Sequence, residues 1–300
     1  MRVFVTGADG FVGSRLVARL RGRGASVLAT DRADLDITQA SHVRAALAEA
    51  RPDAVVHLAA ISFVPAADAD PAQAFRVNYL GTRNVLEAVR RGAPRARVLL
   101  VSSSTVYGPA APGAAPFDEA AALRPATVYA RSKAAADLLG AAYAARGLEL
   151  VRARPWNHSG AGRPDHFVES SFARQIAEIE AGRREARIAV GALDSLRDFL
   201  HVDDVVDAYL ALLAPSVPAG VYNVASGRGI TIRALLDALL AETHVRPEIA
   251  ADPARLRPPD ASVGSAAKLA ARTGWAPRRS LAQVLAELLE HWRSTIGRNV

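Results

Sequence analysis

Tyr129 and Lys133 stand four residues apart in a segment that predicts the start of a helix. Side chains at this spacing lie on one face of a helix, so the two groups could act on the same ligand. A phenol is a poor acid or base at neutral pH, but a nearby ammonium favours the phenolate and lowers its pKa. We therefore expect Tyr129 to transfer a proton and Lys133 to tune it. The role needs a compact amine rather than a guanidinium, and Lys133 is the only lysine before Lys268.

A run of hydroxyl side chains, Ser102 to Thr105, follows a predicted buried strand over 97–101. In an open parallel sheet, ligands bind beyond the carboxyl ends of the strands. This rule places the hydroxyls of Ser103 and Thr105 where chemistry would occur.

The first thirteen residues predict an anion-binding element. A buried strand over 2–6 runs into a glycine-rich loop, and a helix follows at once. Glycines here let the chain turn tightly and let backbone amides approach a pyrophosphate, at which the amino end of the helix directs its dipole. Strand, loop and helix in this order predict a dinucleotide site. The loop residues expected at the cofactor are Gly7, Gly10, Phe11, Val12 and Gly13.

The end of the second predicted strand bears on which dinucleotide binds. Asp31 lies about 20 positions beyond the glycine loop, where an acidic residue holds the ribose hydroxyls of NAD. Its charge would repel the 2′-phosphate of NADP, although Arg32 could attract one, so NAD is favoured over NADP. Asp36 and Ile37 could meet the adenine edge; alternatively, Asp36 or Thr38 simply caps the next helix.

The ends of two further predicted strands complete the expected cofactor site. Leu58, Ala59 and Ala60 close the third strand, and the two alanines leave room for a cofactor over the strand ends. Pro155 stops the fifth strand. We expect His57 to be structural.

The chain alternates predicted strands and helices over 1–155, which is typical of a doubly wound parallel sheet, the Rossmann type of α/β fold. Residues 156–167 then carry no strand signal and are interpreted as a substrate loop. A helix capped by Asp203 and a strand over 221–224 predict a return to the main sheet. We therefore expect a dinucleotide-binding domain made of residues 1–155 with 198–224. We expect a smaller C-terminal substrate-binding lobe made of residues 156–197 with 225–300.

The composition limits the class of protein. The 300 residues are half apolar, carry a net charge of +7 and include no cysteine. Without cysteine there are no disulfides, thiolate metal sites or cysteine nucleophiles, and no metal site is expected. The charge comes from scattered arginines rather than a basic block, so nucleic acid is not an expected partner. With no basic leader and no apolar run near the roughly 18 residues of a membrane helix, we expect a soluble cytoplasmic protein.

These motifs resemble those of the extended short-chain dehydrogenase/reductase family, in its sugar-nucleotide-modifying branch. The matching segments are TGADGFVG (6–13), SSSTVYG (102–108) and YARSK (129–133). In that family a serine or threonine holds the sugar 4-oxygen, tyrosine moves its proton, and hydride passes between C4 and nicotinamide. The resemblance implies that Ser103 holds the oxygen, Thr105 makes a second sugar contact and Tyr129 is the acid or base. It also implies that Lys133 binds the nicotinamide ribose.

The second lobe resembles the GDP-mannose dehydratase and GDP-4-keto-6-deoxymannose reductase group. The similarity implies that Asn157 and Arg197 contact the diphosphate, Arg257 a phosphate, and Asp260 the nucleotide ribose. Guanidinium groups suit diphosphate geometry in any case. Alternatively, Arg197 forms only a surface ion pair, with Asp198 or Asp203. The matching segments are RPWNHSGAG (154–162), FVESSFARQIAEIEAG (167–182), VGALDSLRDF (190–199) and RPPD (257–260).

One difference separates the members of that group. Dehydratases need a carboxylate beside the active-site hydroxyl, and Thr105 occupies that position here. A threonine at its ordinary pKa cannot act as that base. The resemblance therefore implies NAD(P)H-dependent reduction of the C4 ketone of a nucleotide-linked 4-keto-6-deoxyhexose, of the GDP-4-keto-6-deoxymannose to GDP-rhamnose type.

Three alternatives remain: a nucleotide-sugar 4-epimerase, a GDP-mannose 4,6-dehydratase, and a redox-sensing module that keeps the fold without chemistry. Family members commonly dimerise through a helix bundle that includes the tyrosine helix, so the resemblance also implies a homodimer.

Overall fold

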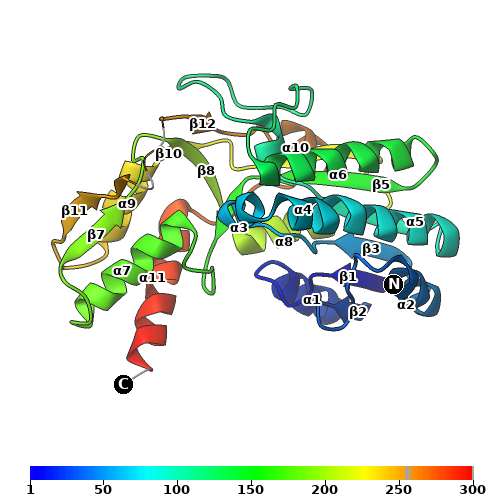
Figure 1. Ribbon diagram of the computed structural model, residues 1–300, viewed down its shortest axis with the longest axis horizontal. Helices are drawn as coiled ribbons and strands as arrows, with labels where there is room; N and C mark the ends of the chain where they lie inside the picture. Colours follow the sequence, from blue (N-terminus) through cyan, green and yellow to red (C-terminus); the bar gives the residue numbers. More distant parts are fainter. Residues whose placement is uncertain (254–255, 257, 299–300) are drawn as a thin grey trace.

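A six-stranded parallel sheet forms the centre of the molecule. The structure is a computed structural model that describes residues 1–253, 256 and 258–298. Its strand order is β2-β1-β3-β4-β5-β9, and each neighbouring pair runs parallel. The sheet confirms the predicted doubly wound α/β fold (Figure 1). Its strands are β1 (Arg2–Thr6), β2 (Ser26–Thr30), β3 (Ala54–His57), β4 (Arg97–Val101), β5 (Leu150–Pro155) and β9 (Gly220–Val224).

Alternating apolar side chains sort the helices into two layers. In β1, Val3 and Val5 point to one face and Phe4 to the other, because successive strand residues alternate. The Val3 face packs on α1 (Gly13–Gly22), α8 (Val202–Leu212) and α10 (Ala267–Thr273). The Phe4 face packs on α2 (Ala40–Ala50), α5 (Thr82–Gly92) and α6 (Val128–Ala144).

Short helical segments join these elements. The chain between β3 and α5 forms α3 (Val64–Ala69), α4 (Pro71–Phe75) and a π-helical turn, η1 (Arg76–Gly81), and the chain after β4 forms a 3₁₀ turn, η2 (Ser104–Tyr107).

The strand order reverses beside β1, which lies between β2 and β3. Thr6 at its end is in register with Thr30 on one side and with His57 on the other. The loops after β1 and β3 therefore lead to opposite faces of the sheet and leave a crevice at the carboxyl ends, which is where open α/β sheets bind ligands.

A smaller lobe lies beside the sheet, on the left of Figure 1. Strand β8 pairs antiparallel with β10 and parallel with β12 and β6, while β7 pairs parallel with β11. Helices α7, α9 and α11 enclose its apolar core. The elements are β6 (Asn157–Ser159), α7 (Val168–Glu180), β7 (Arg187–Val190), β8 (Leu196–His201), β10 (Gly229–Thr231), α9 (Ile232–Ala241), β11 (Glu248–Ala251), β12 (Ala261–Ser262) and α11 (Leu281–Gly297).

The structure differs from the expected second half in three places. The expected loop over 156–167 contains β6, a strand too short to give a periodic signal, which forms by pairing with β8. Helix α8 is capped by His201, whose side chain accepts from the N–H of Asp203, so Asp203 is not the cap. Residues 198–201 belong to β8 of the small lobe, whereas α10, within 225–300, packs on the main sheet.

Among the described residues, no helix is both long enough and apolar enough to cross a membrane.

Candidate active site

The glycine loop is held in a conformation that side chains would block. Gly7 has φ +71°, and a Cβ there would lie 2.8 Å from the backbone nitrogen of Ala59. A Cβ on Gly13 would lie 2.1 Å from the Gly7 carbonyl oxygen. Both positions therefore require glycine, and the first turn of α1 can close against the loop. The backbone here is a cradle in which a pyrophosphate fits against the amino end of α1.

One cavity of about 840 Å³ lies over the carboxyl ends of the central strands. Its volume falls in the range of about 300–1,000 Å³ that is typical of small-molecule sites. Of the described residues that the sequence analysis assigned to the site, Arg197 and Asp260 alone do not line it. The predicted residues that do are Gly7, Gly10, Phe11, Val12, Gly13, Asp31, Arg32, Asp36, Ile37, Leu58, Ala59, Ala60, Ser103, Thr105, Tyr129, Lys133, Pro155 and Asn157.

Two hydroxyl groups face each other directly after β4. Ser103 Oγ and Thr105 Oγ1 lie 2.9 Å apart, at hydrogen-bond distance. Ser103 is the N-cap of η2 and is buried, whereas Thr105 is exposed. The pair can hold an oxygen of a ligand without carrying charge itself.

Lys133 lies on the same cavity wall as Tyr129, one helical turn further along α6. Thr127 caps the helix by accepting from the N–H of Ala130. The Lys133 Nζ donates to the Val101 carbonyl at 2.7 Å, and burial lowers the pKa of this amine to about 8.

The electrostatics of Tyr129 differ from the prediction. Burial raises the pKa of its phenol, and the groups that oppose this rise are Ser103 and the guanidinium of Arg163. The ammonium of Lys133, expected to lower that pKa, instead donates to Val101 at the end of β4. Arg163 is the cation that lowers the Tyr129 pKa in this arrangement, and the tuning of the phenol by Lys133 stays a prediction.

Sequence reasoning missed Arg163, which lines the cavity from the chain after β6. Its guanidinium carbon lies 3.3 Å from the ring centre of Phe167 and 5.2 Å from that of Phe11. Its Nε donates to Glu169 at 3.2 Å. No spacing rule places this arginine beside Tyr129. The available signal was an arginine in the segment already interpreted as a substrate loop.

The loop after β2 presents both a carboxylate and a guanidinium to the cavity. The Asp31 carboxylate accepts from the N–H groups of Ala33 at 2.7 Å and Asp34 at 3.1 Å. A hydrogen bond with Asp9, together with these amides, lowers the pKa of Asp31, so it stays ionised and suits ribose hydroxyls. Arg32 beside it suits a phosphate.

Asp36 and Thr38 do not cap α2. Its N-cap is Gln39, without a side-chain cap, because the Asp36 carboxylate accepts from the N–H of Thr38 in a separate turn. That alternative is therefore wrong, while Asp36 and Ile37 do face the cavity.

Two buried polar residues behind the cavity are structural. His57 lies between the hydroxyls of Thr6, at 2.7 Å, and Thr82, at 3.0 Å, and burial lowers its pKa to about 3. Asn78 donates to Ser132 Oγ and to the carbonyl of Ile61, which ties η1 to α6.

In the small lobe, Arg197 pairs with Asp260 at 2.6 Å. This pairing corrects the alternative that named Asp198 or Asp203. Asp198 is buried and accepts from Ser226 and Gly227, as well as from Gly264. Asp203 pairs with Arg279 and Arg15.

Asn157 in β6 lines the cavity and donates to the Asp198 carbonyl. Arg257 lies outside the described residues.

A model of the NAD dependent epimerase/dehydratase family matches residues 3–225. The chain belongs to this family. The resemblance to extended short-chain dehydrogenases/reductases is thereby confirmed, and this epimerase/dehydratase family member is an NAD(P)-dependent enzyme.

Relatives of this family member include the GDP-6-deoxy-D-mannose reductase of Pseudomonas aeruginosa, which is 40% identical over 299 residues, 98% of each chain. The structure of RMD from Pseudomonas aeruginosa complexed with NADPH is similar, with a TM-score of 0.90 and 38% identity over 98% of this chain and 99% of that chain. The UDP-glucose 4-epimerase of Thermus thermophilus, in complex with NAD, has a TM-score of 0.86 and 30% identity over 98% and 99% of the two chains.

Proposed function

We propose that the enzyme reduces the C4 ketone of a nucleotide-linked 4-keto-6-deoxyhexose, converting GDP-4-keto-6-deoxymannose to a GDP-rhamnose type of product. The distribution of carboxylates in the cavity carries this proposal. Among its described lining residues, the two carboxylates are Asp31 and Asp36, both after β2. The wall with Ser103, Thr105 and Tyr129 carries hydroxyls and the Lys133 amine, and no carboxylate stands among its described residues. Dehydration needs a general base at the sugar, whereas ketone reduction needs only a proton donor.

The reaction follows from the chemistry of these side chains. Ser103 would hold the C4 oxygen, with Thr105 bonded to it, and the Tyr129 phenol would donate its proton to that oxygen. The bound reduced dinucleotide supplies the hydride that C4 accepts. The resulting phenolate is stabilised by the Arg163 cation until solvent returns the proton. Lys133 would bind ribose hydroxyls, exchanging its bond to the Val101 carbonyl for bonds to the cofactor.

The nucleotide end would lie against the small lobe, which we propose as the substrate-binding lobe. Arg197 and Asp260 join β8 to the start of β12 and present a guanidinium and a carboxylate side by side. A guanidinium suits the diphosphate and a carboxylate suits ribose hydroxyls. Asn157, in the neighbouring strand β6, reaches the cavity from the same sheet. The 40% identity to a GDP-6-deoxy-D-mannose reductase supports GDP as the nucleotide.

The test mixes the purified protein with GDP-4-keto-6-deoxymannose and either NADH or NADPH, and follows both nicotinamide absorbance and the sugar product. We expect one reduced cofactor to be oxidised for each GDP-6-deoxyhexose formed. A 4-epimerase would convert a nucleotide sugar with no net change in absorbance. Binding of the cofactor without turnover would contradict the proposal and favour a sensing role.

The proton donor is tested by Tyr129→Phe, which removes the phenolic oxygen and keeps the ring. General acid catalysis contributes about 10²- to 10⁴-fold, so we expect a loss of kcat in that range with dinucleotide affinity retained. Tyr79→Phe, outside the described cavity lining, is the matched control and should keep full activity. Equal activities of the two variants would exclude Tyr129 as the donor.

A further inference from the structure

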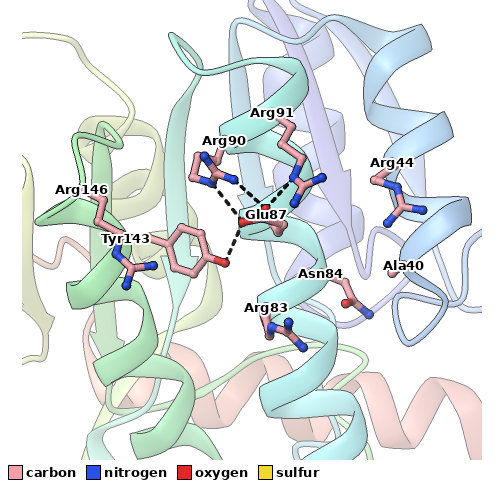
Figure 2. A pocket seen from close by; sticks show the side chains of 9 residues that line it. All are labelled: Ala40, Arg44, Arg83, Asn84, Glu87, Arg90, Arg91, Tyr143 and Arg146. Atoms are coloured by element: carbon pink, nitrogen blue, oxygen red, sulfur yellow. Dashed lines mark hydrogen bonds and ion pairs between the residues drawn. The ribbon is translucent and has the colours of Figure 1, made fainter.

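A second cavity, of about 590 Å³, lies between α2, α5 and the end of α6. Figure 2 shows arginine side chains around it from α2, from α5 and from the turn after α6. They are Arg44 of α2, Arg83, Arg90 and Arg91 of α5, and Arg146 just after α6.

The charges in this cavity do not balance. Glu87 is the one carboxylate among its described lining residues, and it accepts hydrogen bonds from Arg90, Arg91 and the Tyr143 hydroxyl. Those bonds hold the pKa of Glu87 well below its usual range, and the bonds from Arg90 have the largest effect. Glu87 therefore remains ionised. Five guanidinium groups against one carboxylate leave a surplus of four positive charges in one concave site.

Three of the five arginines have no carboxylate partner. Among the described residues, Arg44, Arg83 and Arg146 form no ion pair, although each belongs to a different one of the three lining segments. Two parallel N–H groups of a guanidinium match two oxygens of a phosphate, so each of these side chains offers a bidentate phosphate contact.

The amino end of α2 adds to the same field. Ala40, the first residue of α2, lines the cavity, and the N-cap residue Gln39 provides no side-chain cap. The amino end of α2, with its free N–H groups and the positive end of the helix dipole, therefore lies at the cavity.

The lining also indicates what kind of anion fits. A nucleotide base would need an exposed apolar or aromatic surface, but the Tyr143 ring is buried and its hydroxyl is bonded to Glu87. A single phosphate would meet one or two of the guanidinium groups and leave the rest unpaired. Several linked phosphates without a base would match the number of the charges.

We propose that this cavity binds a short inorganic polyphosphate, with Arg44, Arg83 and Arg146 each taking phosphate oxygens. The anion would cross-link α2, α5 and α6, which together cover one face of the sheet. Asn84 of α5 donates to the carbonyls of Ile37 and Thr38, in the loop whose other side lines the cofactor cavity. The proposal does not depend on which nucleotide sugar the enzyme reduces.

The test is calorimetric titration of the whole protein with inorganic tripolyphosphate at fixed ionic strength. Saturating NADPH and GDP are present, so that the dinucleotide and substrate diphosphate sites are already filled. We expect one site per chain, at least tenfold weaker binding of orthophosphate, and a raised Tm with tripolyphosphate. No binding to the wild-type protein under these conditions would overturn the proposal.

Matched variants separate a built site from general positive charge. The triple variant Arg44→Gln/Arg83→Gln/Arg146→Gln should bind tripolyphosphate at least tenfold more weakly. The control Arg21→Gln/Arg23→Gln/Arg95→Gln removes the same charge from exposed arginines outside the cavity and should keep wild-type affinity. Equal losses in both variants would mean non-specific attraction and contradict the proposal.

Glu87→Gln gives a test with the opposite sign. Removing the one carboxylate frees Arg90 and Arg91 and raises the charge surplus, so we expect tripolyphosphate to bind more tightly. Weaker binding, in a variant whose circular dichroism spectrum matches the wild type, would contradict the proposed role of the arginines.

Discussion

At the scale of single residues, Arg163 changes the account of the proton donor. It lies in the cavity between two aromatic rings, and its positive charge opposes the rise in the Tyr129 pKa that burial causes. In a poorly solvated site an uncompensated phenolate would be costly, so a fixed cation nearby makes proton donation easier. We propose that Arg163 acts on the pKa of the phenol without touching the substrate, and that Lys133 binds the cofactor.

Replacing Arg163 by Gln should raise the pKa of Tyr129, because the cation that favours phenolate is lost. In the reductive direction the phenol must be protonated, so the loss of activity at high pH should move to higher pH. In the oxidative direction the phenolate is required, so activity at neutral pH should fall and the rise in activity should also move to higher pH. Full pH–kcat profiles in both directions check this.

Arg163→Lys is the control for charge alone and should restore most of the wild-type profile. If Arg163→Gln lowered kcat with both profiles unmoved, the guanidinium would act only by packing between Phe11 and Phe167.

At the scale of elements, the turn from β1 into α1 requires glycine where the backbone leaves no space for a Cβ. Helix α1 contains one glycine of this kind, Gly13, and one with free space around it, Gly22. A Cβ on Gly13 would lie 2.1 Å from the Gly7 carbonyl oxygen, whereas a Cβ on Gly22 of the same helix would meet nothing within 4 Å. The two glycines share a helix and differ in surroundings.

Gly13→Ala should therefore displace the loop, abolish measurable NAD(P)H binding and lower the Tm. Gly22→Ala should leave cofactor affinity unchanged and stabilise the fold by up to about 1 kcal/mol, because alanine is the better helix former. Fluorescence titration with NADPH and thermal unfolding of both variants provide the comparison. Similar cofactor affinities would show that the cradle tolerates a side chain.

His57 connects three elements, since it bridges Thr6 of β1 and Thr82 of α5 from its place at the end of β3. Burial lowers its folded-state pKa to about 3, below an unfolded value of about 6.5. Between these values the unfolded chain binds one proton more than the folded chain. The contribution of His57 to the free energy of unfolding is therefore fully present above about pH 6.5 and is lost as the pH falls towards 3.

We expect the unfolding free energy of the wild type to decrease by up to about 1.4 kcal/mol per pH unit through this residue in that window. His57→Gln should be less stable at neutral pH but should show a smaller slope. Urea unfolding at several pH values measures both slopes. Parallel slopes would mean that His57 titrates normally in the folded protein.

At the scale of the whole molecule, three large apolar side chains stay exposed on neighbouring helical segments beside the active site. Leu138 of α6 is 58% exposed, Leu80 of η1 is 42% exposed and Phe75 of α4 is 37% exposed. Exposed apolar side chains that lie together are typical of a contact surface. The homodimer that the resemblance implies, through a bundle that includes the tyrosine helix, would cover these side chains.

In the expected homodimer, Leu138→Arg should leave only a monomer, because an arginine facing its copy cannot be buried without a partner. Ile249→Arg, at an exposed apolar residue of β11 in the other lobe, is the control and should not change the mass. Size-exclusion chromatography with light scattering measures both. A monomeric wild-type protein would remove the prediction.

The sequence by itself determined the local elements of the first half. Strands β1 and β4 have the predicted bounds, and the glycine loop and the Tyr129 helix follow them as expected. These elements are readable because a buried strand, a glycine turn and an amphipathic helix each leave a pattern within a few neighbouring residues. The same local order implies a doubly wound sheet and a ligand site at its carboxyl edge.

Only the tertiary structure decided which distant groups meet. It formed β6 by pairing with β8, placed Arg163 beside Tyr129, joined Arg197 to Asp260, and directed Lys133 to Val101. It also gathered arginines from two helices and from the turn after α6 around one cavity. Such contacts depend on how whole elements pack, and a single charged or polar residue carries no local pattern that names its partner across the fold.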